Sequence, residues 1–318
     1  MYKTNIKSLA TQYGIIIVFI VLFIFFSLAS NVFLTPDNIF NILRQVSIVG
    51  ITAVGMTFVM LTGGIDLSVG SIIGVASVSA AELMIMKVDP VLATIITLLI
   101  CTVIGFINGI LITKCQIPPL IATLGTMTSL RGIAFIITGG MPVFGFQSFG
   151  FLGQGYLWII PIPVIIMVII FGLGYIFLTK MKYGRYIYGT GGNEEASRLS
   201  GINIKRIKYM VYSICGFLSG LAGIILLSRI DSGQPKAGQG YEMDVITAVV
   251  LGGVSITGGE GKIFYVIVGV IIMGILSNGM ILLNINEYVQ WVVKGLVLLA
   301  AVAFDRLNQN RANVSVEG

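Results

Sequence analysis

Long apolar runs without a charged residue constrain this chain more than any other feature. Residues 14–26 and 164–171 are apolar on every side, whichever periodicity is applied to them. Only 10% of the 318 residues are charged, whereas about 25% are charged in a typical soluble domain. With a mean hydropathy of +1.00, the chain has too few polar groups to cover a surface that faces water. The sequence therefore indicates that lipid is its solvent.

Backbone amides in lipid must be paired within the protein, so the chain must form either helices or a closed barrel. Barrel strands alternate apolar and polar residues, and the long runs do not. The sequence predicts an all-α, polytopic transmembrane bundle that forms a single domain over residues 1–318. A membrane helix needs about 20 mostly apolar residues, and ten segments meet this requirement: 13–34, 46–62, 68–87, 90–113, 118–140, 157–179, 209–229, 242–258, 263–283 and 288–304.

The distribution of basic residues predicts the orientation. If the N-terminus is cytoplasmic and each segment crosses once, cytoplasmic loops hold thirteen Lys and Arg residues and outer loops hold four. This bias satisfies the positive-inside rule and predicts a multi-pass protein of the cell (inner) membrane with both termini in the cytoplasm. Residues 27–29 also resemble a signal-peptide cleavage site, although the apolar stretch before them is longer than a signal core. The inner residues are Lys3, Lys7, Lys114, Lys180, Lys182, Arg185, Arg198, Lys205, Arg206, Lys208, Lys262, Arg306 and Arg311, and the outer ones are Arg44, Lys87, Arg229 and Lys236.

The composition argues against several functional classes. There is no histidine, and the three cysteines stand far apart, so neither a metal site nor a disulfide is expected. No arrangement of catalytic residues is evident, and an enzyme is not expected. The basic residues lie scattered in short loops, which gives no reason to expect nucleic acid as a partner. The segment Gly258–Lys262 lacks two residues of a nucleotide-binding P-loop, because Ile256 replaces its first glycine and Ile263 its hydroxyl residue.

The longest predicted cytoplasmic loop, about residues 180–208, contains a short helix. Asn193 is a good N-cap, Glu194 and Glu195 suit the positive end of a helix dipole, and Gly201 suits a helix end. These residues predict about two turns of helix outside the membrane. One interpretation is a linker whose lysines hold the headgroups of membrane lipid. The other is a docking helix for a cytoplasmic partner.

Polar residues within the apolar segments are candidates for a transport path. The segment Gly63–Ser68 interrupts two apolar runs, and Asp66 can cap the following helix with Ser68 in its first turn. This segment is either a plain helix start or a broken helix beside a path. Arg131, Glu82 and Lys294 fall inside predicted helices, where they must meet partners or water. Amide side chains either bind a solute or join helices. The candidate path residues are Asp66, Ser68, Asn108, Arg131 and Asn278.

Two segments also form a candidate internal repeat. The sequence Val59–Gly64 ends in Thr-Gly-Gly, as does Val254–Gly259, and a Gly-Val pair follows each at the same distance. Transporters are often built from such repeats around a central path.

Four motifs together identify a family. Glu195-Ala-Ser-x-x-x-Gly201 resembles the core of the coupling loop in permeases of ATP-binding-cassette importers, although the tail that usually follows this core is missing. Three further stretches, Gly63–Gly70, Gly184–Asn193 and Ala248–Gly259, closely resemble the ribose-type branch of sugar permeases. The similarity runs from about residue 46 to residue 304.

This resemblance implies a permease that imports ribose or a related monosaccharide by alternating access. It implies four partners: a separate ATPase subunit that uses ATP and Mg²⁺, an extracytoplasmic sugar-binding protein, a second permease subunit that forms a homodimer, and membrane lipid. No cofactor is expected in this chain itself. A bulky residue at Glu195 or Gly201 is predicted to uncouple ATP hydrolysis from uptake. An ion-coupled secondary transporter is the alternative, because it too would show repeats and broken helices. The implied ATPase-coupling residues are Asn193, Glu194, Glu195, Ala196, Ser197, Arg198 and Gly201.

Overall fold

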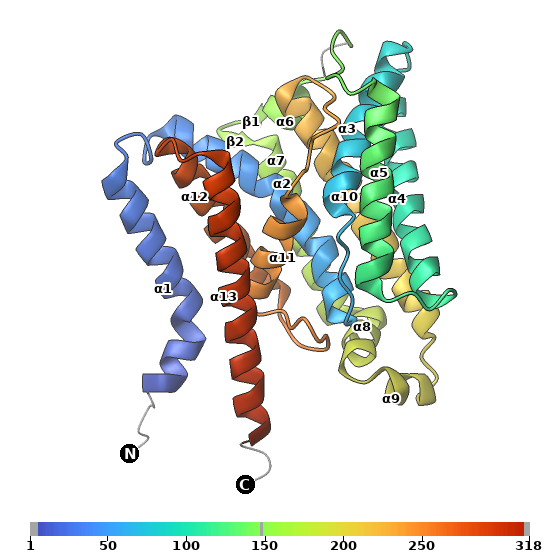
Figure 1. Ribbon diagram of the computed structural model, residues 1–318, viewed down its shortest axis with the longest axis vertical. Helices are drawn as coiled ribbons and strands as arrows, with labels where there is room; N and C mark the ends of the chain where they lie inside the picture. Colours follow the sequence, from blue (N-terminus) through green and yellow to red (C-terminus); the bar gives the residue numbers. More distant parts are fainter. Residues whose placement is uncertain (1–5, 147–148, 315–318) are drawn as a thin grey trace.

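The computed structural model describes residues 6–146 and 149–314, and the side chains of residues 15–303 within those ranges. This part of the chain forms thirteen helices and one two-stranded antiparallel hairpin (Figure 1). The predicted all-helical class is therefore confirmed, apart from the hairpin. The elements are α1 (Ile6–Ala29), α2 (Pro36–Leu61), α3 (Val69–Ile85), α4 (Pro90–Thr113), α5 (Pro119–Thr138), α6 (Phe151–Gln154), β1 (Tyr156–Leu157), β2 (Ile160–Pro161), α7 (Ile162–Lys180), α8 (Lys182–Gly192), α9 (Glu194–Leu199), α10 (Ile204–Ile230), α11 (Tyr241–Leu251), α12 (Ile263–Leu282) and α13 (Glu287–Val314).

Proline and side-chain caps set the starts of several helices. Pro36, Pro90 and Pro119 each occupy the first helical position, where the missing N–H costs nothing and the fixed φ suits the helix. Asp89 strengthens the start of α4, because its carboxylate accepts hydrogen bonds from the backbone amides of the second and third helical residues at 2.9 and 3.2 Å. At the other end of α5, Gly139 takes the left-handed conformation (φ +59°) that ends many helices.

The helix α10 lies at the centre of the bundle and packs against α2, α3 and α4. Most residues of α2 and α10 are buried, whereas only a minority of the residues of α4, α5 and α7 are. The contact between α4 and α10 is backbone to backbone. A Cβ added to Gly105 would overlap the carbonyl oxygen of Tyr212, and one added to Gly216 would overlap that of Cys101. Close approach at small residues is how helices associate in lipid, where no hydrophobic effect drives them together.

Six described helices are long and apolar enough to cross a membrane: α2, α4, α5, α7, α10 and α12. The predicted count of ten spans is not confirmed by length and composition. The expected continuous span 242–258 is wrong, because α11 ends at Leu251 and a turn follows. Gly252 caps the helix and Gly253 has φ +76°, a conformation that residues with a side chain rarely adopt. Eleven residues of helix extend about 17 Å, well short of the roughly 30 Å hydrocarbon core.

Two other predicted segments change their boundaries. The helix α2 begins at Pro36, ten residues before the expected start of the span 46–62. The expected span 157–179 begins instead with the β1–β2 hairpin, so α7 starts only at Ile162. At the tip of this hairpin Trp158 has φ +62° and is 97% exposed.

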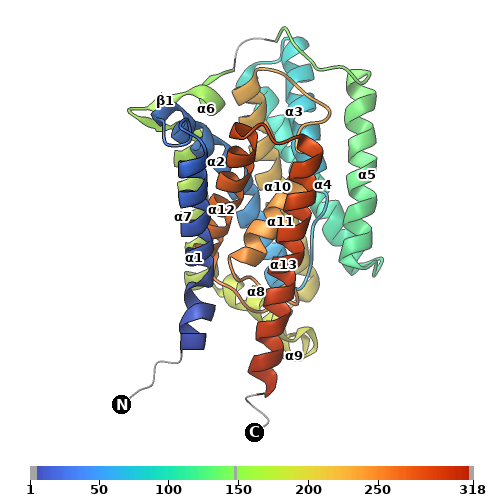
Figure 2. The same ribbon diagram turned by 60° about the vertical axis from the view of Figure 1, so that its left-hand side comes forward.

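The helices α8 and α9 lie together at one end of the molecule, which we call the α9 end. The beginning of α1 and the end of α13 lie at this same end (Figures 1 and 2). The β1–β2 hairpin lies at the opposite end, and Figure 2 shows α5 at the edge of the bundle. Between α2 and α3 the chain runs back along the molecule without helical structure before α3 begins (Figure 1).

Candidate functional site

The predicted short helix is present as α9, with the capping that its sequence indicates. The side chain of Asn193 accepts a hydrogen bond from the backbone amide of Ala196 at 2.8 Å, and Glu194 and Glu195 occupy the first turn. The helix ends at Leu199, and Gly201 takes the left-handed conformation with φ +82°. Its six residues make a helix slightly shorter than the two turns expected.

Most of the surface of α9 is exposed. Every residue from Glu194 to Leu199 is exposed except Ser197, and Leu199 is 78% exposed. Arg198 and Glu195 form an ion pair at 2.6 Å, and this hydrogen bond and the charge of Glu195 raise the pKa of Arg198 above its ordinary value. Such an exposed pair contributes little to stability. The helix therefore presents charged side chains and one large apolar side chain to the surroundings.

The helix α8, which the sequence did not predict, connects α9 to the bundle. It packs against α2, α7, α9 and α10, and Ile187 on its inner face is fully buried. Ser197 packs against Gly189, since a Cβ at that glycine would lie 3.1 Å from the serine Oγ. Beyond α9, Lys208 on α10 forms an ion pair with Glu194 at 2.7 Å. These contacts place α9 at a fixed position on the α9 end.

Three of the five candidate path residues form a buried chain of hydrogen bonds. The Oδ1 atom of Asp66 accepts from the backbone N–H of Ser68 at 2.9 Å and from its hydroxyl at 2.5 Å. The Asn108 amide donates to the Ser68 hydroxyl at 2.9 Å. Thr126 of α5 then donates to Asn108 at 2.7 Å. Asp66, Ser68 and Asn108 are all 0% exposed, so this chain ties the start of α3 to α4 and α5 in the interior.

The Asp66 side chain does not cap α3 in the way expected from the sequence. Ser68, not Asp66, occupies the N-cap position, and Ser68 stands just before the first turn rather than in it. The second carboxylate oxygen, Oδ2, has no hydrogen-bond partner in the described structure, and neither has the buried hydroxyl of Tyr212 on α10. Tyr212 gave no signal in the sequence, because a tyrosine within an apolar helix looks like an ordinary core residue.

Arg131 holds the chain just before α11. Its guanidinium donates to the backbone carbonyls of Pro235 and Ala237 at 3.0 and 2.8 Å. The first turns of α3 and α11 meet beside this segment, because a Cβ on Gly70 would overlap both the carbonyl oxygen of Gly238 and the carboxylate of Glu242. Two short helices that begin side by side in the interior resemble the discontinuous helices of transporters. The sequence indicated the first break but not the second.

The remaining polar candidates join helices. Asn278 of α12 and Asn38 of α2 exchange two amide hydrogen bonds at 3.0 and 2.8 Å. In this structure Asn278 therefore joins two helices. Lys294 on α13 forms an ion pair with Asp244 on α11 at 2.7 Å. The sequence indicated that Lys294 could pair, but it did not indicate the partner. Glu82 lies in the last turn of α3, as expected, and is half-buried.

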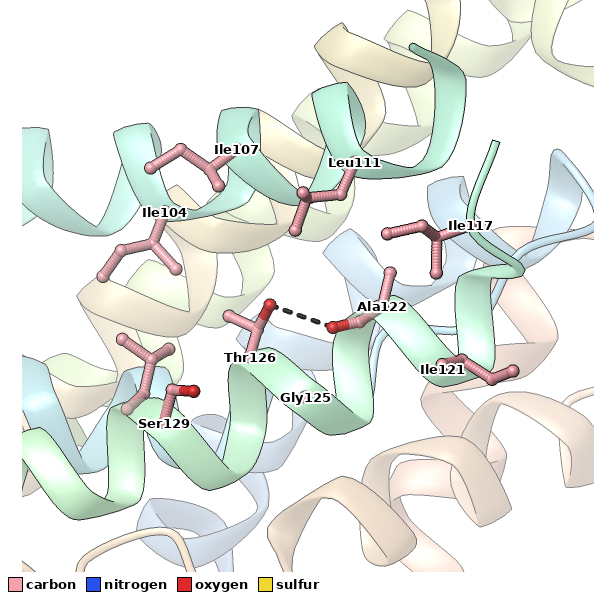
Figure 3. A pocket seen from close by; sticks show the side chains of 10 residues that line it. Ile104, Ile107, Leu111, Ile117, Ile121, Ala122, Gly125, Thr126 and Ser129 are labelled. Carbon is pink, nitrogen blue, oxygen red and sulfur yellow. Dashed lines mark hydrogen bonds between the residues drawn. The ribbon is translucent and has the colours of Figure 1, made fainter. Parts of the chain in front are cut away.

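An apolar groove of about 420 Å³ lies between α4 and α5 (Figure 3). Thr126 and Ser129 supply its only hydroxyl groups, and the Thr126 hydroxyl already bonds the carbonyl oxygen of Ala122 at 3.0 Å. A polar solute needs several convergent hydrogen-bonding groups, so this groove suits an apolar chain better than a polar substrate.

Neither a metal centre nor a nucleotide cradle is formed by the described residues. Among them, no three His, Cys, Asp or Glu side chains gather as metal ligands would. Gly258–Lys262 forms a turn before α12, with Gly258, Gly259 and Gly261 at positive φ. This turn closes on itself through a hydrogen bond from the Ser255 amide to the Glu260 carbonyl oxygen at 3.0 Å.

The fold defines a membrane-embedded, polytopic helical protein with a short exposed helix, α9, outside its bundle. Residues 38–302 match the family described as the permease component of the branched-chain amino acid transport system, and the chain belongs to this family. Members of this family are transport permeases, so the expectation that the chain is not an enzyme is confirmed.

Full-length relatives agree with this assignment. The ribose import permease of Bacillus subtilis is 49% identical over 292 residues, which cover 90% of each chain. The ribose import permease of Escherichia coli is 44% identical over 306 residues, or 95% of each chain. The L-arabinose transport system permease of Escherichia coli is 44% identical over 303 residues, 94% of this chain and 91% of the relative. No solved structure matches the chain significantly.

Proposed function

We propose that this chain is the membrane-spanning permease subunit of an ATP-binding-cassette importer for ribose or a closely related monosaccharide. The observation that carries the proposal is the 49% identity to a ribose import permease, which extends over 90% of both chains. The chain would move the sugar by alternating access, driven by a separate ATPase subunit.

The substrate class follows from the relatives rather than from the family description. That description names branched-chain amino acids, whereas the full-length relatives import ribose or L-arabinose. Both are small polar pentoses. A neutral sugar also requires no charged counterpart, so the polar groups of a path need only hydrogen-bond it.

The exposed helix α9 supports a docking role for residues 193–201. An importer permease needs a surface that a cytoplasmic ATPase subunit can bind. The helix α9 offers the exposed side chains of Glu195, Arg198 and Leu199, beside Glu194, which pairs with Lys208 of α10. ATP and Mg²⁺ would bind to that subunit, and no cofactor is proposed for this chain. A sugar-binding protein would deliver the substrate at the opposite end.

A second copy of the chain fits the outer face of α5. Gly125, Thr128, Ser129 and Gly132 form an exposed stripe of small side chains on this helix, and Gly125 and Ser129 also border the groove between α4 and α5. Among the described residues, none outside the helix lies within 4 Å of a Cβ added at either glycine. Small and hydroxyl residues in lipid favour close helix packing. We therefore propose a homodimer, with lipid around the remaining apolar faces.

The proposed topology has ten passages, with both termini in the cytoplasm. The short helices α3 and α11 would complete their passages with the irregular segments that precede or follow them. The α1 start and the α13 end lie at the same end of the molecule as α9, which supports an even number. Asp66, Ser68, Asn108, Arg131 and Asn278 stay predictions as path residues. The first three, being fully buried, would become accessible only in another conformation.

Reconstitution in proteoliposomes tests the proposal. The chain, its partner ATPase and the sugar-binding protein should take up radiolabelled ribose when ATP is supplied, and excess L-arabinose should compete if the site accepts pentoses generally. An ATPase with its catalytic residue inactivated is the matched control and should abolish uptake. Uptake that continues with this control but stops when the ion gradient is dissipated would identify the ion-coupled alternative instead.

The docking role has its own control within the same system. Replacing Glu195 with tryptophan alters the exposed face of α9 without touching the bundle, so the permease should fold normally but bind the ATPase poorly. The control is the reverse exchange at the opposite end of the molecule, where Trp158 is exposed. A Trp158→Glu variant should bind the ATPase as the unmodified chain does. Full coupling in Glu195→Trp would contradict docking through α9.

A further inference from the structure

Three glycine pairs meet where α8 joins the bundle. They are Gly63–Gly64 after α2, Gly191–Gly192 at the end of α8, and Gly258–Gly259 before α12. A Cβ added to Gly191 would overlap the carbonyl oxygen of Leu61 and lie 2.5 Å from the amide nitrogen of Gly259. One added to Gly258 would lie 2.6 Å from the nitrogen of Gly63 and 3.0 Å from the Cα of Gly191. The three backbones therefore touch directly, and we call this contact the glycine joint.

Hydrogen bonds hold the joint together. The backbone N–H of Gly259 donates to the carbonyl oxygen of Leu61, the last residue of α2, at 3.0 Å. The hydroxyl of Tyr188 on α8 donates to the carbonyl oxygen of Gly261 at 2.8 Å. Gly63, Gly258, Gly259 and Gly261 all have positive φ, which glycine adopts without strain. The turns thus have both the conformation and the missing side chains that this contact requires.

The glycine joint connects the two copies of the candidate repeat. Gly63–Gly64 and Gly258–Gly259 are the corresponding Thr-Gly-Gly endings of the two segments, and each begins the connection to the next helix, α3 or α12. The last turn of α8 lies against both. One residue later, at Asn193, α9 begins. A single element therefore joins the proposed docking helix to both halves of the bundle.

We propose that the glycine joint is the point at which a displacement of α9 reaches the α2–α3 and α11–α12 connections at the same time. Gly191 and Tyr188 are then positioning residues for the coupling of ATP hydrolysis to transport. This inference rests on the proposed function of the chain. Contacts between backbones leave no flexible side chain to absorb a movement, and tightly packed interfaces transmit strain rather than dissipate it. Both connections must therefore shift when α8 shifts.

Gly191 and Gly192 offer a matched pair of substitutions. Both end α8, and neither has a positive φ, so alanine suits the backbone at either position. Among the described residues, none lies within 4 Å of a Cβ added at Gly192 beyond its own helix and chain neighbours, whereas a Cβ added at Gly191 meets two backbones. Gly191→Ala should keep ATPase binding and ATP hydrolysis but lower the sugar imported per ATP about tenfold, the effect of roughly 1.4 kcal/mol. Gly192→Ala should match the unmodified chain.

Tyr188→Phe provides a second test that adds no volume. It removes the hydrogen bond to Gly261 while keeping the ring, and it should lower the sugar imported per ATP by about 2- to 10-fold, the range expected for one hydrogen bond. The complex should still assemble during purification. If Gly191→Ala fails to fold, Tyr188→Phe alone decides the outcome.

The results separate this inference from the proposed function. An unmodified complex that shows no ATP-driven sugar uptake would refute the proposed function. An active complex in which Tyr188→Phe and a folded Gly191→Ala both import as much sugar per ATP as Gly192→Ala would refute the glycine joint alone. Loss of coupling in Tyr188→Phe and Gly191→Ala, with coupling kept in Gly192→Ala, would support the role of the glycine joint.

Discussion

At the scale of single residues, the mostly apolar interior contains a chain of hydrogen-bonded polar side chains. Asp66, Ser68 and Asn108 are fully buried, and their hydrogen bonds link the start of α3 to α4 and, through Thr126, to α5. A buried polar group without a partner costs about 1–3 kcal/mol, so each member of the chain depends on the next. This makes Asp66, which accepts two of the hydrogen bonds, the residue on which the start of α3 depends most.

We predict that Asp66→Asn preserves this arrangement and that Asp66→Leu does not. An asparagine oxygen can accept both hydrogen bonds from Ser68, whereas leucine leaves the Ser68 amide without an acceptor. The leucine variant should lose about 1–3 kcal/mol of stability, seen as a lower unfolding temperature of the purified protein in detergent. If Asp66→Leu unfolds at the same temperature as the unmodified protein, the polar chain has no structural role.

At the scale of elements, the sequence predicts helices well where apolar length alone defines them. The helix α4 follows its predicted span at both ends, because Pro90 starts it and the apolar run continues to Thr113. The helix α11 was predicted too long, since Val249 to Val254 is apolar throughout and only the Gly252–Gly253 pair indicates the turn. The helix α8 was missed, because four glycines among its eleven residues argue against a helix. Its packing in the bundle overrides that preference.

The proposed docking segment and the candidate path residues also differ in how well the sequence predicts them. Local capping chemistry at Asn193 and Gly201 was sufficient to predict α9. The partners of Arg131 and Asn278 lie 104 and 240 residues away in sequence, and no local pattern indicates such contacts. The meeting of the three glycine pairs was equally hidden, although the turns at Gly63–Gly64 and Gly258–Gly259 were visible in the sequence.

The ion pair between Lys294 and Asp244 joins α13 to α11. We predict that removing one partner destabilises the protein more than removing both. Asp244 is buried, so Lys294→Met leaves a carboxylate without its cation and should cost about 3–5 kcal/mol. The double variant Asp244→Asn with Lys294→Met removes both charges and should recover most of that loss. The unfolding temperatures of the single and double variants in detergent measure this difference in stability. A double variant less stable than the single one would contradict the pairing.

At the scale of the whole molecule, its two ends differ in what they present. The α9 end carries the exposed charges of α9 and the lysines and arginines on either side of it, as well as the α1 start and the α13 end. The opposite end carries the exposed aromatic hairpin tip at Trp158. Tryptophan is typical of membrane interfaces, and basic residues are typical of cytoplasmic loops. The proposed orientation, with the ATPase at the α9 end, agrees with both tendencies.

The natural cysteines allow this orientation to be tested without altering the chain. Cys115 is exposed in the turn between α4 and α5 at the α9 end, whereas Cys101 and Cys215 are buried in the bundle. A membrane-impermeant maleimide should therefore label the protein in inverted membrane vesicles but not in right-side-out vesicles. A Cys115→Ser, Trp158→Cys variant should show the reverse pattern, because residue 158 lies at the opposite end. Labelling of Cys115 from the outside would place α9 where no cytoplasmic ATPase can reach it, and the docking role of α9 would then be untenable.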